Sequence, residues 1–346
     1  MEFREYLLEQ LAAHPSAQPQ DVVKLCYQAA RGPEHLLADM ERAKAYFQQE
    51  WDATEAAAAP LYEALSDGFC RVNLAAWKAE DLPGEWLFRM FALSAAAPGG
   101  EDQLEAYLAA AETAVESGNT CIRPEEFRRY LSEYRAAGMP AVHHSPAYRA
   151  AEKPAYRIVC RRIVRLLPVL KLAAACESRP CVIALDGPAA SGKTTMAEQL
   201  QAILGADVIH MDDFFLPLPL RTPERLAEAG GNVHYERFRE EVLPRLRDEA
   251  GFAYTRFDCS VMDYNGQRAV GSAPFRIVEG SYSGHPVFGD YADISVFSHI
   301  SAEEQMARIL RRNGPVMAER FRNVWIPMEE TYFAVHGIRE KADVCV

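Results

Sequence analysis

Three features are missing from this sequence, and each absence argues against a class of protein. None of the eight cysteines forms a CxxC pair, so zinc is not expected and the thiols should be reduced and mostly buried. No apolar run approaches the roughly 18 residues of a membrane span. The start, MEFREYLLEQLAAH, carries acids and lacks the pattern of a signal or transit peptide. We therefore expect a cytoplasmic protein that does not enter a membrane.

A concentration of positive charge is also missing. The formal net charge is −12, and it is divided evenly: residues 1–178 contain 19 basic and 25 acidic side chains, and the remainder 18 and 24. Neither half is expected to bind nucleic acid or an anionic membrane through its bulk charge. An anionic substrate would need local positive groups.

The length of 346 residues predicts two domains, because single cores rarely grow that large. Residues 1–176 show apolar stripes at helical spacing and predict a mainly helical domain of unknown role. The last of its predicted helices runs through Ile158, Val159, Ile163, Leu166, Leu167 and Leu170, with four arginines on its other side: Arg157, Arg161, Arg162 and Arg165.

Residues 177–346 change to short apolar runs that alternate with amphipathic segments. This alternation predicts an α/β domain, in which helices cover both faces of a parallel sheet. The chain ends inside the last of these runs, which leaves open whether the natural protein continues. The predicted strands are Cys181–Leu185, Asp207–His210, Phe275–Glu279, Ile294–Phe297 and Asp343–Val346.

The segment Gly187–Thr194, GPAASGKT, fits G-x-x-x-x-G-K-[ST] at every fixed position. A predicted strand runs into it and a predicted helix follows, which is the context that a phosphate loop (P-loop) requires. Backbone N–H groups and the helix N-terminus would bind phosphates. Lys193 would reach the β- and γ-phosphates, and Thr194 would ligate Mg²⁺. The predicted nucleotide-binding residues are Gly187, Ala189, Ala190, Ser191, Gly192, Lys193, Thr194 and Thr195.

Two predicted strands end in acids. Asp212 follows the second strand and could accept the proton of a substrate hydroxyl or hold Mg²⁺; the alternative is that Asp212 or Asp213 caps a helix. Glu279 ends the third strand and could be a magnesium carboxylate, or a solvated glutamate. Further along, Arg308, Arg311 and Arg312 share one helical face. They could clamp a transferring phosphoryl group, or form a solvated basic face.

Together these motifs resemble the uridine kinase family, within the group that includes phosphoribulokinase and bacterial pantothenate kinase. The resemblance implies an ATP-dependent kinase with Asp212 as general base, and Mg²⁺ shared by Thr194, Asp212 and Glu279. It covers about Cys181–Val346 and depends on the P-loop, Asp212–Phe215, Glu279–Gly280, Arg308–Arg312, Pro327–Glu330 and Ala342–Val344.

The acceptor pocket departs from the family pattern. His234 replaces the aspartate of Asn-aromatic-Asp-His-Pro, and Met262 stands where a histidine reads the pyrimidine. Losing buried hydrogen-bonding groups should cost selectivity for that base, so the acceptor stays undefined. The polar side chains that could still bind one are His234, Tyr235, Arg237, Asp258, Tyr264, Tyr282 and Arg320.

The helical half offers fewer candidates. His35 and the pair His143–His144 are the sharpest, but no third metal ligand appears at a definable spacing. Packing or surface roles are therefore the expectation for these histidines.

The prediction for the whole chain is an ATP- and Mg²⁺-dependent kinase with a small-molecule hydroxyl acceptor, a nucleoside or another alcohol. Lys193, Arg308 and Arg311 would assist Asp212. The alternative is a nucleotide-binding regulatory or sensor protein whose helical domain engages a partner. A homo-oligomer is compatible with the sequence, which does not give the oligomeric state.

Overall fold

The computed structural model describes residues 3–33, 39–95, 101–118 and 120–346. The chain divides into two compact units, Met1–Arg165 and Leu166–Val346, and each is described by itself. The division lies before the predicted boundary at 176/177, because α10 (Leu167–Ala175) contacts strand β9 of the second unit. None of the helices in the described part of the chain has the length and apolar character that a bilayer crossing requires.

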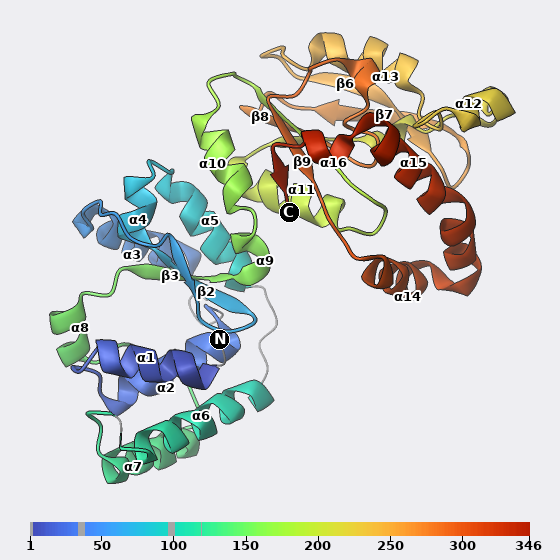
Figure 1. Cartoon of the computed structure of the whole chain (residues 1–346). Helices are drawn as coiled ribbons and strands as arrows, with labels where there is room; N and C mark the ends of the chain where they lie inside the picture. The colour runs from blue at the N-terminus through green and yellow to red at the C-terminus, as the bar shows by residue number, and fades with distance from the viewer. Residues whose placement is uncertain (1–2, 34–38, 96–100, 119) are drawn as a thin grey trace. The chain divides into compact units, whose positions relative to one another are not determined.

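The first unit combines helices with a small antiparallel sheet of order β1-β2-β3 (Figure 1). Helices α1, α2, α6 and α7 contact one another, whereas α4, α5 and α9 contact the sheet. Its helices are α1 (Phe3–Ala13), α2 (Pro19–Arg31), α3 (Met40–Ala53), α4 (Leu74–Ala79), α5 (Gly84–Ala95), α6 (Glu101–Glu116), α7 (Pro124–Ala136), α8 (Pro146–Glu152) and α9 (Arg161–Val164). Its strands are β1 (Tyr62–Ala64), β2 (Phe69–Asn73) and β3 (Tyr156–Cys160).

The prediction of one helix from Ile158 to Leu170 is wrong. Residues Tyr156–Cys160 form strand β3, which pairs with β2 in the register Val159↔Cys70. The helical residues that follow are divided between α9 and α10. The run of β-branched residues within β3 suits a strand, and the pairing with a distant segment decides its conformation. The predicted arginine face is therefore broken as well, and Arg157 is buried in the sheet.

The second unit is built on a parallel sheet of order β10-β9-β4-β8-β5. Its strands are β4 (Cys181–Asp186), β5 (Asp207–His210), β8 (Phe275–Glu279), β9 (Ile294–Phe297) and β10 (Val344–Cys345). All five lie where the sequence predicts strands. β4 and β8 are buried at every position, as expected for strands covered on both faces.

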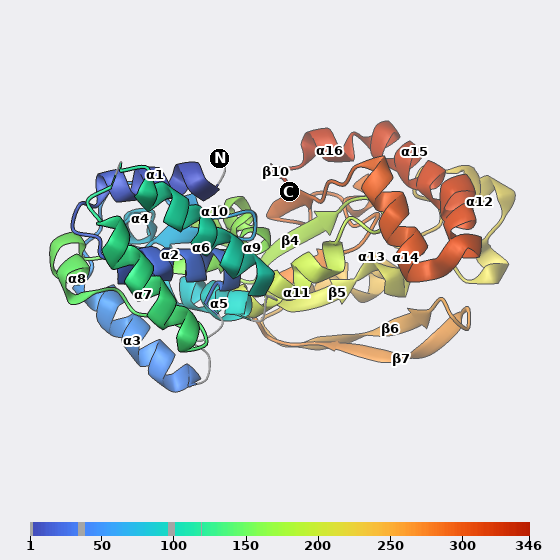
Figure 2. The same cartoon turned by 90° about the horizontal axis from the view of Figure 1, so that it is seen from below.

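Helices and a hairpin surround this sheet. Helix α11 (Lys193–Leu204) packs on β4, β5 and β8, and α16 (Ile338–Lys341) contacts β9. The hairpin of β6 (Phe252–Asp258) and β7 (Asp263–Val270) extends as a long ribbon (Figure 2). It is not among the predicted strands. The remaining helices are α12 (Pro223–Ala227), α13 (Tyr235–Glu241), α14 (Ala302–Arg320) and α15 (Ile326–His336).

Candidate functional site

Three polar side chains end neighbouring strands at one edge of the sheet. Asp186 is the last residue of β4, His210 of β5 and Glu279 of β8. The register pairs Leu185 with Glu279 and His210 with Glu279. Because all strands are parallel, their carboxyl ends meet at this edge. From β4 the chain passes first to β5, which lies on one side of β4 in the sheet. Only later does it reach β9, which lies on the other side of β4. Such a switch point is where open α/β sheets bind ligands.

The segment after β4 has the backbone of a phosphate loop. Gly187 has φ +143° and Gly192 φ +101°, conformations that glycine adopts without strain. At Gly187 a Cβ would lie 2.4 Å from the Ser298 carbonyl oxygen, so only glycine fits there. The non-glycine Ala190 also has positive φ, +61°. Helix α11 begins directly at Lys193, which places a helix N-terminus beside the loop.

Surrounding donors turn the loop carbonyls outward. The Lys193 Nζ donates to the carbonyls of the first two loop residues, at 2.7 and 2.9 Å. Two side chains of α14 contact the next three carbonyls. Gln305 donates to the carbonyl of Ala189 at 3.0 Å, and Arg308 donates to those of Ala190 and Ser191 at 3.1 and 3.3 Å. All five carbonyls of Gly187–Ser191 are thus occupied. The Pro188 carbonyl also accepts the Ser191 N–H at 3.1 Å, so not every loop amide is left for a ligand.

The interior of the loop fits an anion. Among the described residues, the N–H groups of Ala190 and Gly192 have no acceptor. The hydroxyl of Ser191 is buried and has no hydrogen-bond partner. Unpaired buried donors of this kind are costly, and phosphate oxygens would satisfy them. Of the other predicted nucleotide-binding residues, Thr194 and Thr195 are exposed at the start of α11.

The amide of Ala189, also predicted to bind phosphate, is already bonded to protein. It donates to Glu329 Oε2 at 2.8 Å, and Ser281 donates to the other carboxylate oxygen at 2.7 Å. Glu329 comes from α15 and is buried; burial raises the pKa of its carboxyl. This carboxylate therefore positions the loop from outside. Glu329 has no predicted role in the sequence.

A second supporting carboxylate, Asp186, was not predicted. It is 3% exposed and accepts from the backbone N–H groups of Gly187, Tyr282 and Gly284 at 2.7, 3.1 and 2.8 Å. The Tyr332 hydroxyl donates at 2.8 Å. Burial raises the pKa of this carboxyl. Asp186 thereby connects the start of the P-loop to the turn after β8 and to α15.

The two acids after β5 have different environments. Asp213 is buried, accepts from Tyr254 at 2.9 Å and pairs with Arg268 at 2.7 Å. Asp212 is exposed, and no hydrogen bond or ion pair to it is found among the described residues. Both lie inside the 3-10 helix Met211–Phe214, whose N-cap position is His210, so neither is its capping residue. Asp213 therefore has a structural role, whereas Asp212 remains available for a substrate.

Asp212, Glu279 and Thr194 are the predicted magnesium ligands. Glu279 is buried and lies 3.5 Å from the Thr194 hydroxyl and 2.6 Å from His210 Nδ1. Solvent reaches the Asp212 side chain, but the protein packed around it still desolvates the carboxylate. This desolvation and repulsion from Glu279 raise the pKa of Asp212, while Lys193 lowers it. The two carboxylates are thus close enough to interact. Carboxylate and hydroxyl oxygens are the ligands that Mg²⁺ prefers, so this donor set suits the ion.

Only one of the two predicted catalytic arginines touches the loop. Arg308 contacts its carbonyls as described and also pairs with Glu304 at 2.5 Å. Arg311 is exposed and makes no hydrogen bond among the described residues. Helix α14 is interrupted at Gly314, φ 76° and ψ 173°, before Pro315. Arg308 is therefore the arginine best placed for a phosphate.

The predicted acceptor side lies next to Asp212. Residue Phe215 pairs with Val233, which brings the segment Asn232–Arg237 beside the chain that follows Asp212. Three side chains of this segment hold buried polar atoms without a hydrogen bond: Asn232 Oδ1, His234 Nδ1, and Arg237 Nε and Nη1. Tyr282, with φ 77°, interacts with Asn232. Burial and Arg237 lower the pKa of His234. Arg237 itself donates to the Asp213 carbonyl and pairs with Glu241 at 3.7 Å, so this group is polar and contains one guanidinium charge that protein groups already contact.

The other predicted acceptor residues have partners elsewhere. Tyr235 donates to Glu228 at 3.0 Å, and the Asp258 carboxylate accepts from Ser260 within the hairpin turn at 2.6 Å. Tyr264 is exposed and packs on Phe257. Arg320 is exposed at the end of α14 and lies over the Trp325 ring.

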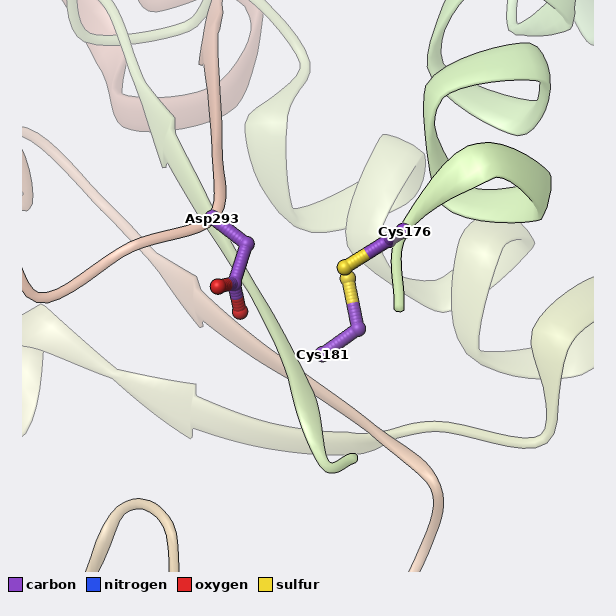
Figure 3. Close-up of side chains that lie close together, drawn as sticks. All are labelled: Cys176, Cys181 and Asp293. Carbon is purple, nitrogen blue, oxygen red and sulfur yellow. The ribbon is translucent and has the colours of Figure 1, made fainter. Parts of the chain in front are cut away.

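One other group of potential metal ligands exists in the described part of the chain. Cys176, Cys181 and Asp293 place their ligand atoms within 4.8 Å of one another (Figure 3). The Asp293 carboxylate, however, accepts from both Nη atoms of Arg247, at 2.6 and 3.0 Å. Burial and the neighbouring Cys176 raise the pKa of the Cys181 thiol, whereas metals bind thiolates. This group is therefore poorly suited to a metal.

The three histidines singled out in the first unit fall in different places. His35 lies outside the described residues. His143 is exposed, and His144 is buried between Asp21 and Tyr156.

No family model matches this chain, and neither does any curated protein. Among solved structures, a protein described as a possible uridine kinase from Bacillus stearothermophilus is 20% identical, with a TM-score of 0.41 over 54% of this chain and 97% of that one. A candidate fructose transport system kinase from a Silicibacter species is 23% identical, with a TM-score of 0.44 over 53% and 98%. Similarities this weak carry no argument about function, which rests on the contacts described above.

Proposed function

We propose that the second unit is an ATP- and Mg²⁺-dependent kinase that phosphorylates a hydroxyl group of a small molecule. The observation that carries this proposal is Asp212, an acid beside Glu279 and the P-loop that accepts no hydrogen bond from the part of the chain that the structure describes. A protein that only senses a nucleotide has no need of a proton acceptor there. The neighbouring Asp213, fully engaged by Tyr254 and Arg268, supplies the structural contacts that Asp212 does not make.

Each residue has a defined part in this proposal. The amides of Ala190 and Gly192 and the Ser191 hydroxyl bind phosphate oxygens, and Lys193 moves from the loop carbonyls to the β- and γ-phosphates. Thr194, Asp212 and Glu279 hold Mg²⁺, which neutralises phosphate charge when bound. Asp212 takes the proton of the acceptor hydroxyl as that oxygen attacks the γ-phosphorus and its bond to the leaving diphosphate breaks.

The acceptor is a small polar alcohol. The segment Asn232–Arg237 lies beside the chain that follows Asp212. Among the described residues no hydrogen bond is found for the buried Asn232 Oδ1 and His234 Nδ1, and such groups favour a ligand that can hydrogen-bond them. They do not reproduce the base-reading residues of uridine kinases, so a nucleoside is one candidate among several.

A panel assay tests the proposal. Purified protein, ATP and Mg²⁺ are incubated with nucleosides, sugars and pantothenate, and transfer is measured by mass spectrometry. We expect at least one acceptor to outcompete water, and Asp212→Asn to reduce transfer to it about 100- to 10,000-fold. If no acceptor outcompetes water and Asp212→Asn leaves slow ATP hydrolysis unchanged, the regulatory alternative replaces the kinase.

A further inference from the structure

The linker between α10 and β4 carries a cysteine at each end. Cys176 directly follows α10, and Cys181 is the first residue of β4. Both belong to the second unit, and both thiols are free. Their sulfur atoms lie within 4.8 Å of each other, and the two side chains point toward one another (Figure 3). The fold therefore brings together two thiols that are five positions apart in the sequence.

Hydrogen bonds hold this linker in a closed turn. The Nη1 atom of Arg179 donates to the carbonyls of Cys176 and Ser178, each at 2.6 Å, which folds the linker back on itself. The Ser178 hydroxyl donates to Asp293 at 3.0 Å, and the same carboxylate accepts from the N–H of the second β4 residue at 2.7 Å. These contacts fix the linker at both ends, so the approach of the two thiols follows from the course of the backbone.

The two thiols differ in access. Cys176 is half-buried, and residues 177–179 beside it are exposed, so small molecules in solution can reach it. Cys181 is 0% exposed, and burial together with the neighbouring Cys176 raises the pKa of its thiol. Cys181 is therefore closed to reagents in solution. A reagent that attacks this pair has to react at Cys176 first.

Proximity and exposure occur separately at other cysteines of the chain. Cys70 and Cys160 stand on the paired strands β2 and β3, one register position apart, but they are only 0% and 3% exposed. Cys121 is exposed and lies shortly before α7. The pair at the start of β4 combines an accessible sulfur with a buried neighbour. This is the arrangement of an attacking and a resolving cysteine.

We propose that Cys176 and Cys181 are a redox-active pair that forms a reversible disulfide bond, with hydrogen peroxide as the oxidant. The Cys176 thiol loses its proton and its sulfur attacks one peroxide oxygen; the O–O bond breaks, which leaves a sulfenic acid and one water. The Cys181 sulfur then attacks the Cys176 sulfur. The S–O bond breaks as the S–S bond forms, and the Cys181 proton leaves with the hydroxide as a second water. The two thiols thus lose two electrons, and the peroxide is reduced to two waters.

The disulfide closes the linker into a ring and ties the end of α10 to the start of β4. An S–S bond is about 2.05 Å long, so the sulfurs have to approach further, and the exposed residues 177–179 leave the linker room to adjust. The cross-link restricts the unfolded chain, and for a unit of this size it should raise Tm by about 4–8 °C. Because β4 leads directly into the P-loop at Gly187, the bond fixes the strand that precedes this loop.

Mass spectrometry of the full chain tests the pair. Native protein is treated with hydrogen peroxide, denatured, alkylated with iodoacetamide and digested with trypsin without reduction. Both cysteines fall in the peptide Leu172–Lys193, because Pro180 protects the bond after Arg179 from trypsin. The disulfide form takes up no alkyl group and lacks two hydrogen atoms, whereas the reduced form takes up two alkyl groups. We expect the disulfide form to predominate after peroxide, and dithiothreitol to restore the reduced form.

Three variants separate the roles of the two thiols. Cys181→Ala should leave Cys176 as a sulfenic acid that dimedone captures, whereas Cys176→Ser should leave Cys181 reduced. Cys345→Ser, at an exposed thiol, should form the disulfide as the wild type does. Thermal melting of the oxidised wild type, compared with Cys176→Ser treated in the same way, should show the rise in Tm of about 4–8 °C.

The proposal is overturned if the peptide of the treated wild type still takes up two alkyl groups while the exposed Cys121 is oxidised. It is equally overturned if Cys181 is oxidised as readily in Cys176→Ser as in the wild type. A third contrary result is an oxidised protein that melts below the reduced one, because the native fold would then not accommodate the bond. The first of these results comes from the wild-type protein alone, so the test stays valid if a variant fails to fold.

Discussion

Replacing Asp186 is expected to destabilise the second unit and to weaken nucleotide binding together. This carboxylate accepts four hydrogen bonds, from the backbone N–H groups of Gly187, Tyr282 and Gly284 and from the Tyr332 hydroxyl. In Asp186→Ala the three buried N–H groups lose their acceptor. The P-loop would then be detached from the turn after β8, so the anion site should be disordered as well.

The size of the effect follows from counting the groups left unpaired. A buried donor without an acceptor costs about 1–3 kcal/mol, so three of them cost about 3 kcal/mol even at the low end. We therefore expect Asp186→Ala to lose about 3 kcal/mol, Asp186→Asn about 1–2 kcal/mol, and Tyr332→Phe about 1 kcal/mol.

Urea denaturation followed by circular dichroism measures this series, and fluorescent-nucleotide titration measures ATP affinity alongside it. The loss of about 3 kcal/mol corresponds to a fall in Tm of about 6–12 °C for a unit of this size. Asp290→Ala, at an exposed carboxylate of the same unit, is the control. The reasoning is refuted if Asp186→Ala is as stable as this control, or if the three variants do not follow the stated order.

Two further predictions concern the loop and its support. Glu329→Gln should change how stability depends on pH. A raised folded-state pKa means that the unfolded chain ionises first, so Glu329 lowers stability as pH rises above its ordinary pKa of 4.5. Relative to the wild type, the urea midpoint of the variant should therefore rise between pH 4.5 and pH 7, and an offset between the two proteins that does not change with pH would contradict this. Gly187→Ala should cost about 2 kcal/mol or more, because its Cβ would lie 2.4 Å from the Ser298 carbonyl; unchanged thermal melting would contradict that expectation.

The strands and the P-loop of the second unit could be predicted because their information is local. Cys181–Leu185 is a continuous apolar run that follows Pro180, and a strand buried on both faces has that pattern. The loop motif requires glycine at positions 187 and 192, and both Gly187 and Gly192 have positive φ in the structure. The position of Asp212 at the end of β5 followed from the same strand pattern.

The missed elements have two different causes, exposure of the strand for β7 and pairing with a distant segment for β3. β7 is exposed at nearly every position, so it has no apolar alternation, and its Asn-Gly pair resembles a turn. β3 is apolar enough to continue a helical stripe, and its pairing with β2, more than 80 residues earlier in the chain, decides its conformation. Neither signal is visible within a short window of sequence.

The site residues that were not predicted depend on contacts with segments that are distant in the sequence. In the sequence, Asp186 is simply the residue before the loop motif. Its partners are the turn at Tyr282–Gly284 and the Tyr332 hydroxyl, which lie about 100 to 150 residues later in the chain. Glu329 stands in a helix more than 130 residues after the Ala189 amide that it binds. Only the fold brings these partners together.

The central claim, that Asp212 is the proton acceptor of a kinase, is tested most directly by separating chemistry from nucleotide binding. Single-turnover phosphoryl transfer to the best acceptor and equilibrium ATP affinity are measured for the wild-type protein and for Asp212→Asn. We predict transfer reduced about 100- to 10,000-fold, with ATP affinity changed by less than about tenfold. Undiminished transfer in Asp212→Asn, or a loss of ATP affinity that accounts for the whole decrease, would contradict the account.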